Sequence, residues 1–244
     1  MKRLYEKSEI WFAVAWIIIY CMVMSVGDTL SVSVGIEKVV TFPIAVVLSM
    51  VLYLFLKKNG LLEDYGLCKA KIPASKMLFY IPVLVMLTAN LWYGISISIS
   101  PVEAIFYVLT MLCVGFLEEV IFRGLLFNAM RKDGVKSAII ISSLTFGIGH
   151  IVNLFNGSQT ALLPNLLQVV YATAAGFMFV MIYYKTESLI VCIVSHGVFN
   201  ALSIFVNEAA VTDTMQILSC VFLIVVCGGY AVYLTRIKSD VKGG

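Results

Sequence analysis

Two adjacent glutamates, Glu118 and Glu119, lie in the middle of a long hydrophobic stretch, and Arg123 follows one helical turn later. The chain has only two histidines, His150 and His196, and both also lie within hydrophobic segments. An ionisable side chain at bilayer depth costs at least about 3 kcal/mol, so such residues are kept where they have a partner or a function. This set of side chains could support hydrolysis of a peptide bond inside a membrane.

The spacing of the two glutamates from Arg123 predicts different roles for them. Glu119 and Arg123 are four residues apart, which is the favourable order for an acid–base pair on one helical face. Pairing allows both side chains to stay charged where neither could alone. Glu118 is rotated by about 100° from Glu119, so its carboxylate points elsewhere. The spacing therefore predicts a structural pair and a free carboxylate.

Two further pairs repeat this four-residue spacing. His196 and Asn200 are expected to share one helical face. Phe146 and His150 share another, where the phenyl ring could pack against or shield the imidazole. Gly147 beside His150 removes a side chain and allows a neighbouring helix or a substrate to approach closely.

A carboxylate, two imidazoles and a carboxamide suit amide hydrolysis. One carboxylate and one imidazole can polarise a water, while imidazole and amide N–H groups can donate to the developing oxyanion. Glu118, His150 and His196 could instead bind zinc and leave one position open for water. The H-E-x-x-H signature of zinc proteases is absent. The residues therefore leave both a zinc site and a site without a cofactor open.

The composition places these residues in a membrane protein. The 244 residues are 61% hydrophobic and 13% charged, whereas about half of a soluble domain is apolar. No basic cluster is dense enough to follow a phosphate backbone, which argues against nucleic-acid binding. The six cysteines form no C-x-x-C pair, so neither structural disulfides nor a thiolate metal site is expected. The sequence predicts an all-α bundle of about eight transmembrane helices.

Eight hydrophobic stretches are long enough to be spans, at about 10–26, 39–56, 77–95, 102–130, 137–155, 162–184, 189–205 and 217–234. With both termini on the cytoplasmic side, 15 of the 17 basic residues fall on that side: Lys2, Arg3, Lys7, Lys57, Lys58, Lys69, Lys71, Lys76, Arg131, Lys132, Lys136, Lys185, Arg236, Lys238 and Lys242. Lys38 alone falls outside, and Arg123 lies within a span. This asymmetry predicts an integral protein, expected in the cell membrane, with both termini in the cytoplasm.

The predicted spans bring the polar residues to similar depths. Glu118 and His150 each lie roughly 20 Å along their helices from the cytoplasmic boundary, with His196 at about 11 Å and Asn200 at about 17 Å. Three helices from separate parts of the chain would thus place these side chains near one level.

Three motifs occur in the order expected for a known family of membrane proteases: Glu118-Glu119-x-x-x-Arg123, Phe146-x-x-x-His150 and His196-x-x-x-Asn200. They resemble the motifs of the CPBP intramembrane proteases, also called the Abi or CAAX-protease family. That family includes eukaryotic Ras-converting CAAX endopeptidases and bacterial relatives linked to bacteriocin processing and self-immunity. The resemblance divides the chain into an unspecific region 1–101, a catalytic core 102–206, and a last span with a basic cytoplasmic tail, 207–244.

The resemblance implies an intramembrane endopeptidase, of glutamate or metallo type, that cuts near the C-terminus of a membrane-associated or lipid-modified protein or peptide. It implies that Glu118 activates the attacking water, that His150 helps to hold this water, and that His196 and Asn200 stabilise the oxyanion. Zinc stays open as a cofactor.

Two other functions compete with the protease. One is a non-proteolytic protein for immunity against a bacteriocin or peptide, or a scaffold, which would sequester a membrane-active peptide. The other is a proton-coupled transporter that uses the glutamates and histidines as a relay. A transporter would need a polar path to both sides, and the outer halves of these spans have few polar residues.

Overall fold

The computed structural model describes residues 1–156 and 161–237. Helices dominate these residues, and the only β-type pairing among them is an isolated bridge between Ile95 and Val206. The expected all-α fold is therefore confirmed. The tail from 238 to 244, which includes Lys238 and Lys242, lies outside the described residues.

The α-helices follow the order α1 (Lys2–Lys7), α2 (Glu9–Val34), α3 (Thr41–Lys58), α4 (Ile81–Leu87), α5 (Pro101–Glu118), α6 (Asn128–Arg131), α7 (Val135–Gly149), α8 (Leu162–Thr186), α9 (Ile190–Leu202) and α10 (Asp213–Thr235). Short 3₁₀ or π segments join or extend them: η1 (Ala74–Tyr80), η2 (Ala89–Tyr93), η3 (Glu119–Phe127), η4 (His150–Leu154), η5 (Ser203–Phe205) and η6 (Glu208–Ala210).

The predicted spans correspond to helical stretches in the structure. Seven of these stretches in the described residues are long and apolar enough to cross a membrane, and Ile190–Phe205 is a shorter apolar one. The protein is therefore an integral membrane protein with a helical bundle. The first helix runs on to Val34, so Asp28 lies within α2 and not in the outer loop that the hydrophobic pattern predicted.

The third span is not the single helix that the hydrophobic stretch predicted. Leu78, Phe79 and Tyr80 have φ angles of 49°, 50° and 58°, which interrupt the helix before α4 begins. Pro82 lies in the first turn of α4, a position that proline tolerates because no helical partner exists for its missing N–H. Hydropathy reports burial in lipid but carries no signal of such a break.

The fourth span is continuous from Pro101 to Arg131, and its middle is a π segment. A capping box begins it, because the Ser100 side chain accepts from the Glu103 backbone and the Glu103 carboxylate accepts from the Ser100 N–H. The segment η3 then widens the helix directly after Glu118.

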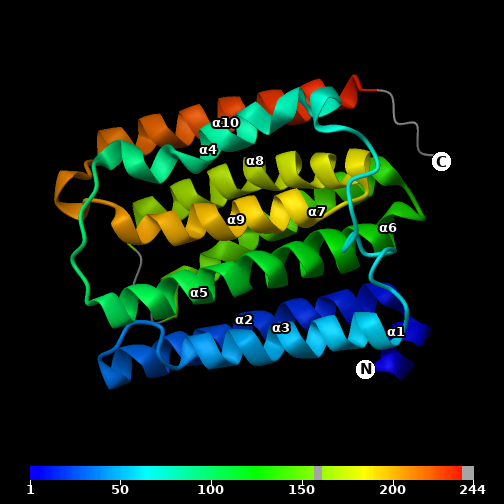
Figure 1. The fold of residues 1–244 in the computed structure, drawn as a ribbon, viewed down its shortest axis with the longest axis horizontal. Coiled ribbons are helices and arrows are strands. Elements are labelled where there is room, and N and C mark those ends of the chain that lie inside the picture. The colour runs from blue at the N-terminus through cyan, green and yellow to red at the C-terminus, as the bar shows by residue number, and fades with distance from the viewer. Residues whose placement is uncertain (157–160, 238–244) are drawn as a thin grey trace.

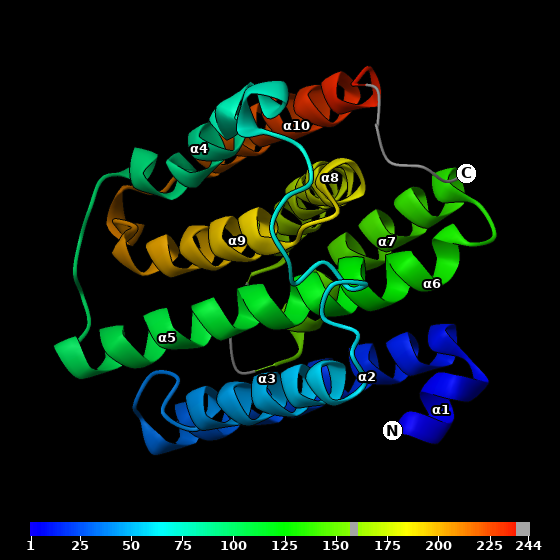
Figure 2. The ribbon, with the colours of Figure 1, turned by 45° about the vertical axis from the view of Figure 1, so that its right-hand side comes forward.

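Figure 1 shows α5 between the α2–α3 pair and α9, with α4 and α10 on the far side of α9. Figure 2 shows α7 and α8 behind this arrangement, with α8 packed against both α7 and α10. We call the end of the bundle where α2 begins and α10 ends the terminus end. The opposite end, which holds the α2–α3 connection and the start of α5, is the loop end.

Candidate active site

A close crossing of α5 and α9 positions the central residues. A Cβ atom built on Gly115 would lie 2.6 Å from the backbone N and 2.7 Å from the Cα of Gly197. Only glycine permits this approach, since small residues let helix backbones come together in membranes. His196 directly precedes Gly197, and Glu118 follows Gly115 by one turn. The crossing therefore sets His196 beside the two glutamates.

The π segment begins at this crossing. Its i→i+5 hydrogen bonds make a wider turn than an α-helix, and such insertions are frequent at functional sites. Glu118 is the last residue of α5 and Glu119 the first of η3. Their side chains have different environments: Glu119 is completely buried, whereas 12% of the Glu118 side chain is exposed.

Glu119 binds two cations or potential cations at once. Its Oε1 accepts a hydrogen bond from His196 Nδ1 at 2.8 Å and lies 3.1 Å from Arg123 Nη1. The guanidinium of Arg123 also lies over the Phe146 ring, with Cζ 3.9 Å from its centroid. A buried charge needs such compensation, which the carboxylate and the ring face supply together.

His196 is held in one orientation by these contacts. Its ring stacks on Phe179 with centroids 5.7 Å apart, and the Phe146 ring meets it edge-on at 5.6 Å. Because a carboxylate only accepts, the bond to Glu119 requires the proton on Nδ1. Nε2 is then directed toward Glu118, whose Oε2 lies 3.5 Å away.

Glu118 has one bound oxygen and one open oxygen. The Tyr20 hydroxyl of α2 donates to Oε1 at 2.6 Å. Oε2 is buried and makes no hydrogen bond to any described residue. A buried carboxylate oxygen without a hydrogen-bond partner is costly, and a site that binds a water is the explanation that accounts for it best.

His150 is fixed by its own helix. Its Nδ1 donates to the Phe146 carbonyl at 3.0 Å, since a carbonyl only accepts, and the Phe146 ring lies edge-on at 5.0 Å. The Asn165 side chain donates to the His150 carbonyl at 2.8 Å and so ties the start of η4 to α8. The bond to Phe146 leaves Nε2 with its lone pair.

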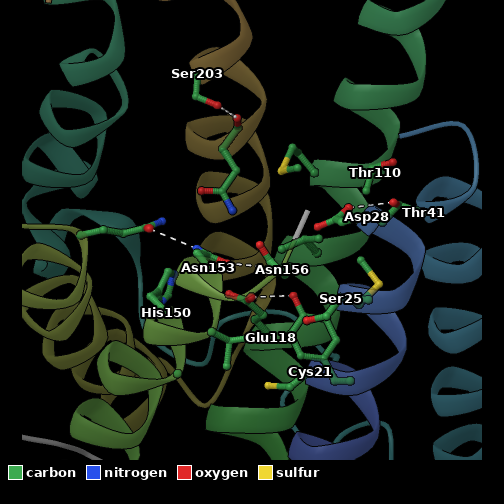
Figure 3. Close-up of a pocket in the computed structure, with 18 of the residues that line it drawn as sticks. Cys21, Ser25, Asp28, Thr41, Thr110, Glu118, His150, Asn153, Asn156 and Ser203 are labelled. Carbon is green, nitrogen blue, oxygen red and sulfur yellow. Dashed lines mark hydrogen bonds between the residues drawn. The ribbon is translucent and has the colours of Figure 1, made fainter. Parts of the chain in front are cut away.

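Glu118, His150 and Asn200 line a cavity of about 320 Å³. His196 does not line this cavity but a smaller one of about 30 Å³, which His150 and Asn200 also line. Figure 3 shows Glu118 and His150 on facing walls, with Cys21 and Ser25 of α2 on the Glu118 side. No hydrogen bond holds the Asn200 carboxamide within the part of the chain that the structure describes, so its N–H groups are available to a ligand. The cavity volume is at the lower end of the range for ligand sites, about 300–1,000 Å³.

The structure thus brings together the seven residues that the sequence singled out: Glu118, Glu119, Arg123, Phe146, His150, His196 and Asn200. One relation differs from expectation, because Glu119 bonds to His196 as well as to Arg123.

Sequence reasoning missed Tyr20, Gly115 and Asn165. Tyr20 lies in the middle of its span, unlike the tyrosines that mark membrane interfaces, and this depth was the available signal. Nothing in a single sequence says which glycine meets which helix.

The donor set does not fit a metal ion as arranged. Across residues 1–156 and 161–237, no three His, Cys, Asp or Glu side chains converge as a metal-binding group. We therefore derive no chemical step through zinc.

Comparison with known proteins agrees with the motifs. Residues 100–202 match the family model described as type II CAAX prenyl endopeptidase Rce1-like. Searches of curated proteins and of solved structures returned no significant match. The matched segment begins at the capping box of α5 and ends with α9, so it contains the glutamates and both histidines but not Tyr20. This match over residues 100–202 confirms the resemblance to the CAAX proteases that the motifs indicated.

Proposed function

We propose that this protein is an intramembrane endopeptidase that hydrolyses a peptide bond near the C-terminus of a membrane-associated or lipid-modified protein or peptide, with water activated by Glu118. The family match supports a protease of the CAAX type in general. The observation that carries the catalytic assignment is the open oxygen of Glu118, buried against the cavity and unbonded while Tyr20 holds its other oxygen.

In the proposed reaction, Glu118 Oε2 takes a proton from a water whose oxygen attacks the carbonyl carbon. The Nε2 lone pair of His150 accepts a hydrogen bond from the same water and so helps to hold it. The tetrahedral oxyanion accepts from Asn200 Nδ2. When the C–N bond breaks, the proton on Glu118 passes to the departing amine.

His196 donates to the oxyanion from Nε2 in its doubly protonated form, because the Nδ1 proton already bonds to Glu119. Glu119 and Arg123 orient His196 and do not touch the substrate in this scheme.

The remaining features of the proposal concern the membrane. The basic residues at the terminus end support cytoplasmic termini, in a cell membrane. The hydrogen bond from Tyr20 to Glu118 supports a catalytic site that extends beyond the core 102–206, because α2 of region 1–101 contributes Tyr20 to it. The partners are the bilayer and the peptide substrate.

The test uses protein purified in detergent and a fluorogenic reporter peptide. Glu118→Gln keeps the shape and an acceptor for Tyr20 but removes the base, so kcat should fall by about 10²–10⁴-fold. Glu208→Gln is the matched control, because Glu208 lies exposed in η6 and should leave kcat unchanged. Full activity of Glu118→Gln would show that the catalytic assignment is wrong.

The same variant separates the protease from an immunity or scaffold protein. If the function in cells depends on cleavage, Glu118→Gln abolishes both peptide processing and the protection of cells against a membrane-active peptide. If the chain only sequesters a peptide, protection survives while no peptide bond is cut by the purified wild-type protein.

A further inference from the structure

The cavity extends from Glu118 in one direction only. On α5 its wall runs from Glu118 back to Tyr107, a rise of about 16 Å toward the start of the helix. On α2 it runs from Tyr20 forward to Asp28, about 12 Å toward the end of that helix. Both directions lead to the loop end. Lys38, in the α2–α3 connection itself, also lines the cavity, so the cavity reaches this end of the bundle.

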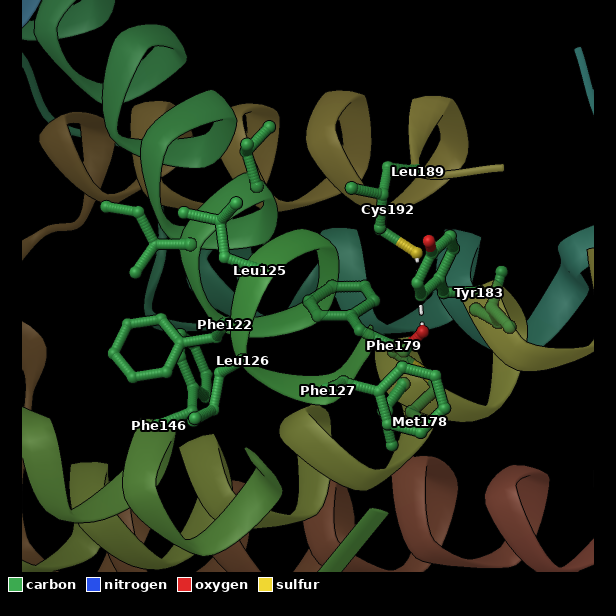
Figure 4. Packing of buried hydrophobic residues seen from close by; sticks show 14 of the residues in the cluster. Phe122, Leu125, Leu126, Phe127, Phe146, Met178, Phe179, Tyr183, Leu189 and Cys192 are labelled. Carbon is green, nitrogen blue, oxygen red and sulfur yellow. Dashed lines mark hydrogen bonds between the residues drawn. The ribbon is translucent and has the colours of Figure 1, made fainter. Parts of the chain in front are cut away.

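The opposite direction is closed by an apolar cluster around η3. Figure 4 shows these side chains packed against one another. Each is at most 4% exposed: Phe122, Leu125, Leu126, Phe127, Phe146, Met178, Phe179, Tyr183, Leu189 and Cys192. Phe122 and Phe146 form the floor of the cavity. Water or a peptide therefore has no path from the terminus end to Glu118 through this cluster.

The two ends differ in charge. The basic residues of the described chain lie at the terminus end, apart from Arg123 within the bundle and Lys38 at the loop end. Lys38 is itself neutralised there, since its ammonium lies 2.8 Å from Asp28 and 3.7 Å from Glu37. Because basic segments stay on the cytoplasmic side of a membrane, the terminus end is cytoplasmic and the loop end is not.

We infer that the substrate is a peptide segment exposed on the extracytoplasmic side of the membrane, and that it reaches Glu118 through the loop end. The inference rests on the proposed function, since the cavity is a substrate path only if Glu118 is the catalytic base. The walls above Glu118 suit such a ligand, because they are polar and because the Asn200 carboxamide, unbonded within the described residues, can bond to a peptide backbone. The other carboxamides and hydroxyls of these walls make hydrogen bonds within the chain: Asn90, Thr110, Gln168 and Ser203.

A membrane-impermeant maleimide tests the opening. Ser25→Cys places a thiol on the cavity wall, in a parent that carries Cys21→Ala because Cys21 lines the same wall. Glu208→Cys marks the loop end and Lys58→Cys the terminus end, and both positions are exposed. The amount of maleimide bound to each variant is measured relative to the parent. Spheroplasts expose the outer face of the membrane to the reagent, and inverted vesicles expose the cytoplasmic face.

We expect Ser25→Cys and Glu208→Cys to react from outside, and Lys58→Cys to react only in inverted vesicles. Three results would overturn the inference. In the first, the maleimide labels Ser25→Cys only in inverted vesicles, as it does Lys58→Cys. In the second, the two end markers are labelled from the opposite sides to those expected. In the third, Ser25→Cys stays unlabelled while both markers are labelled.

Cleavage in detergent keeps this inference distinct from the proposed function, since solubilised protein has no sides. Absence of cleavage there refutes the protease whatever the labelling shows. With cleavage established, reporter peptide is added to one side of sealed vesicles. Cleavage should occur in right-side-out vesicles, and cleavage confined to inverted vesicles would refute extracytoplasmic access while leaving the protease intact.

Discussion

Replacing Gly115 with alanine should damage catalysis from a position that never touches substrate. The added Cβ would lie 2.6 Å from the Gly197 N, 2.7 Å from its Cα and 2.9 Å from the Ile193 carbonyl, all backbone atoms that cannot rotate away. Ordinary contact begins at 3.4 Å, so α9 must move by about 1 Å. This shift stretches the 2.8 Å bond between His196 and Glu119 beyond hydrogen-bond range.

A displacement of about 1 Å can cost roughly 100-fold in rate, and overpacking costs about 1–3 kcal/mol of stability. We expect kcat/KM for the reporter peptide to fall by roughly 100-fold, and the Tm in detergent to fall by about 2–4 °C per kcal/mol. Gly228→Ala in α10 is the matched control, because nothing lies within 4 Å of the Cβ it would add. If Gly115→Ala kept the activity and Tm of Gly228→Ala, the helix crossing would not position the site as described.

Four further outcomes are expected. Tyr20→Phe removes a hydrogen bond to the Glu118 carboxylate worth about 1.5–3 kcal/mol of stability, so Tm should fall; kcat should fall as well, with KM near wild type, because Glu118 loses the contact that orients it, and an unchanged kcat would refute that positioning role. Asn200→Ala should lower kcat by about 10²–10³-fold if its N–H stabilises the oxyanion, and an effect on KM alone would refute that role. Arg123→Met leaves Glu119 buried without its ion pair and should cost about 3–5 kcal/mol in thermal unfolding, part of which Glu119→Gln in the same chain should restore. Chelation with phenanthroline should leave peptide cleavage unchanged, and loss of activity that zinc restores would overturn the metal-free scheme.

The spans and the polar motifs could be predicted because their signals are local. A stretch of about 20 apolar residues must be helical in lipid, where every backbone polar group needs an internal partner. The four-residue spacings likewise fix which side chains share a helical face. Hydropathy failed at Leu78, Phe79 and Tyr80, because the break in the third span depends on backbone angles within a sequence that is apolar throughout.

The partners of each catalytic candidate depend on contacts between distant segments. Glu119 looked accounted for by Arg123, four residues away, yet its hydrogen bond goes to His196, 77 positions later. Tyr20 is 98 positions from Glu118 and precedes the segment that matches the family. No periodicity links such residues, since only the packing of helices decides which of their faces meet.

The sequence by itself determined a helical membrane protein with three ordered protease motifs and a basic side, because hydrophobicity, spacing and charge are properties of the chain. Only the tertiary structure decided that Glu118 keeps one oxygen open, that Gly115 lets α9 deliver His196, and that the cavity leads to the loop end. Those features depend on how closely particular backbones approach and on which buried atoms lack a partner. Both are properties of packed helices and not of any one of them.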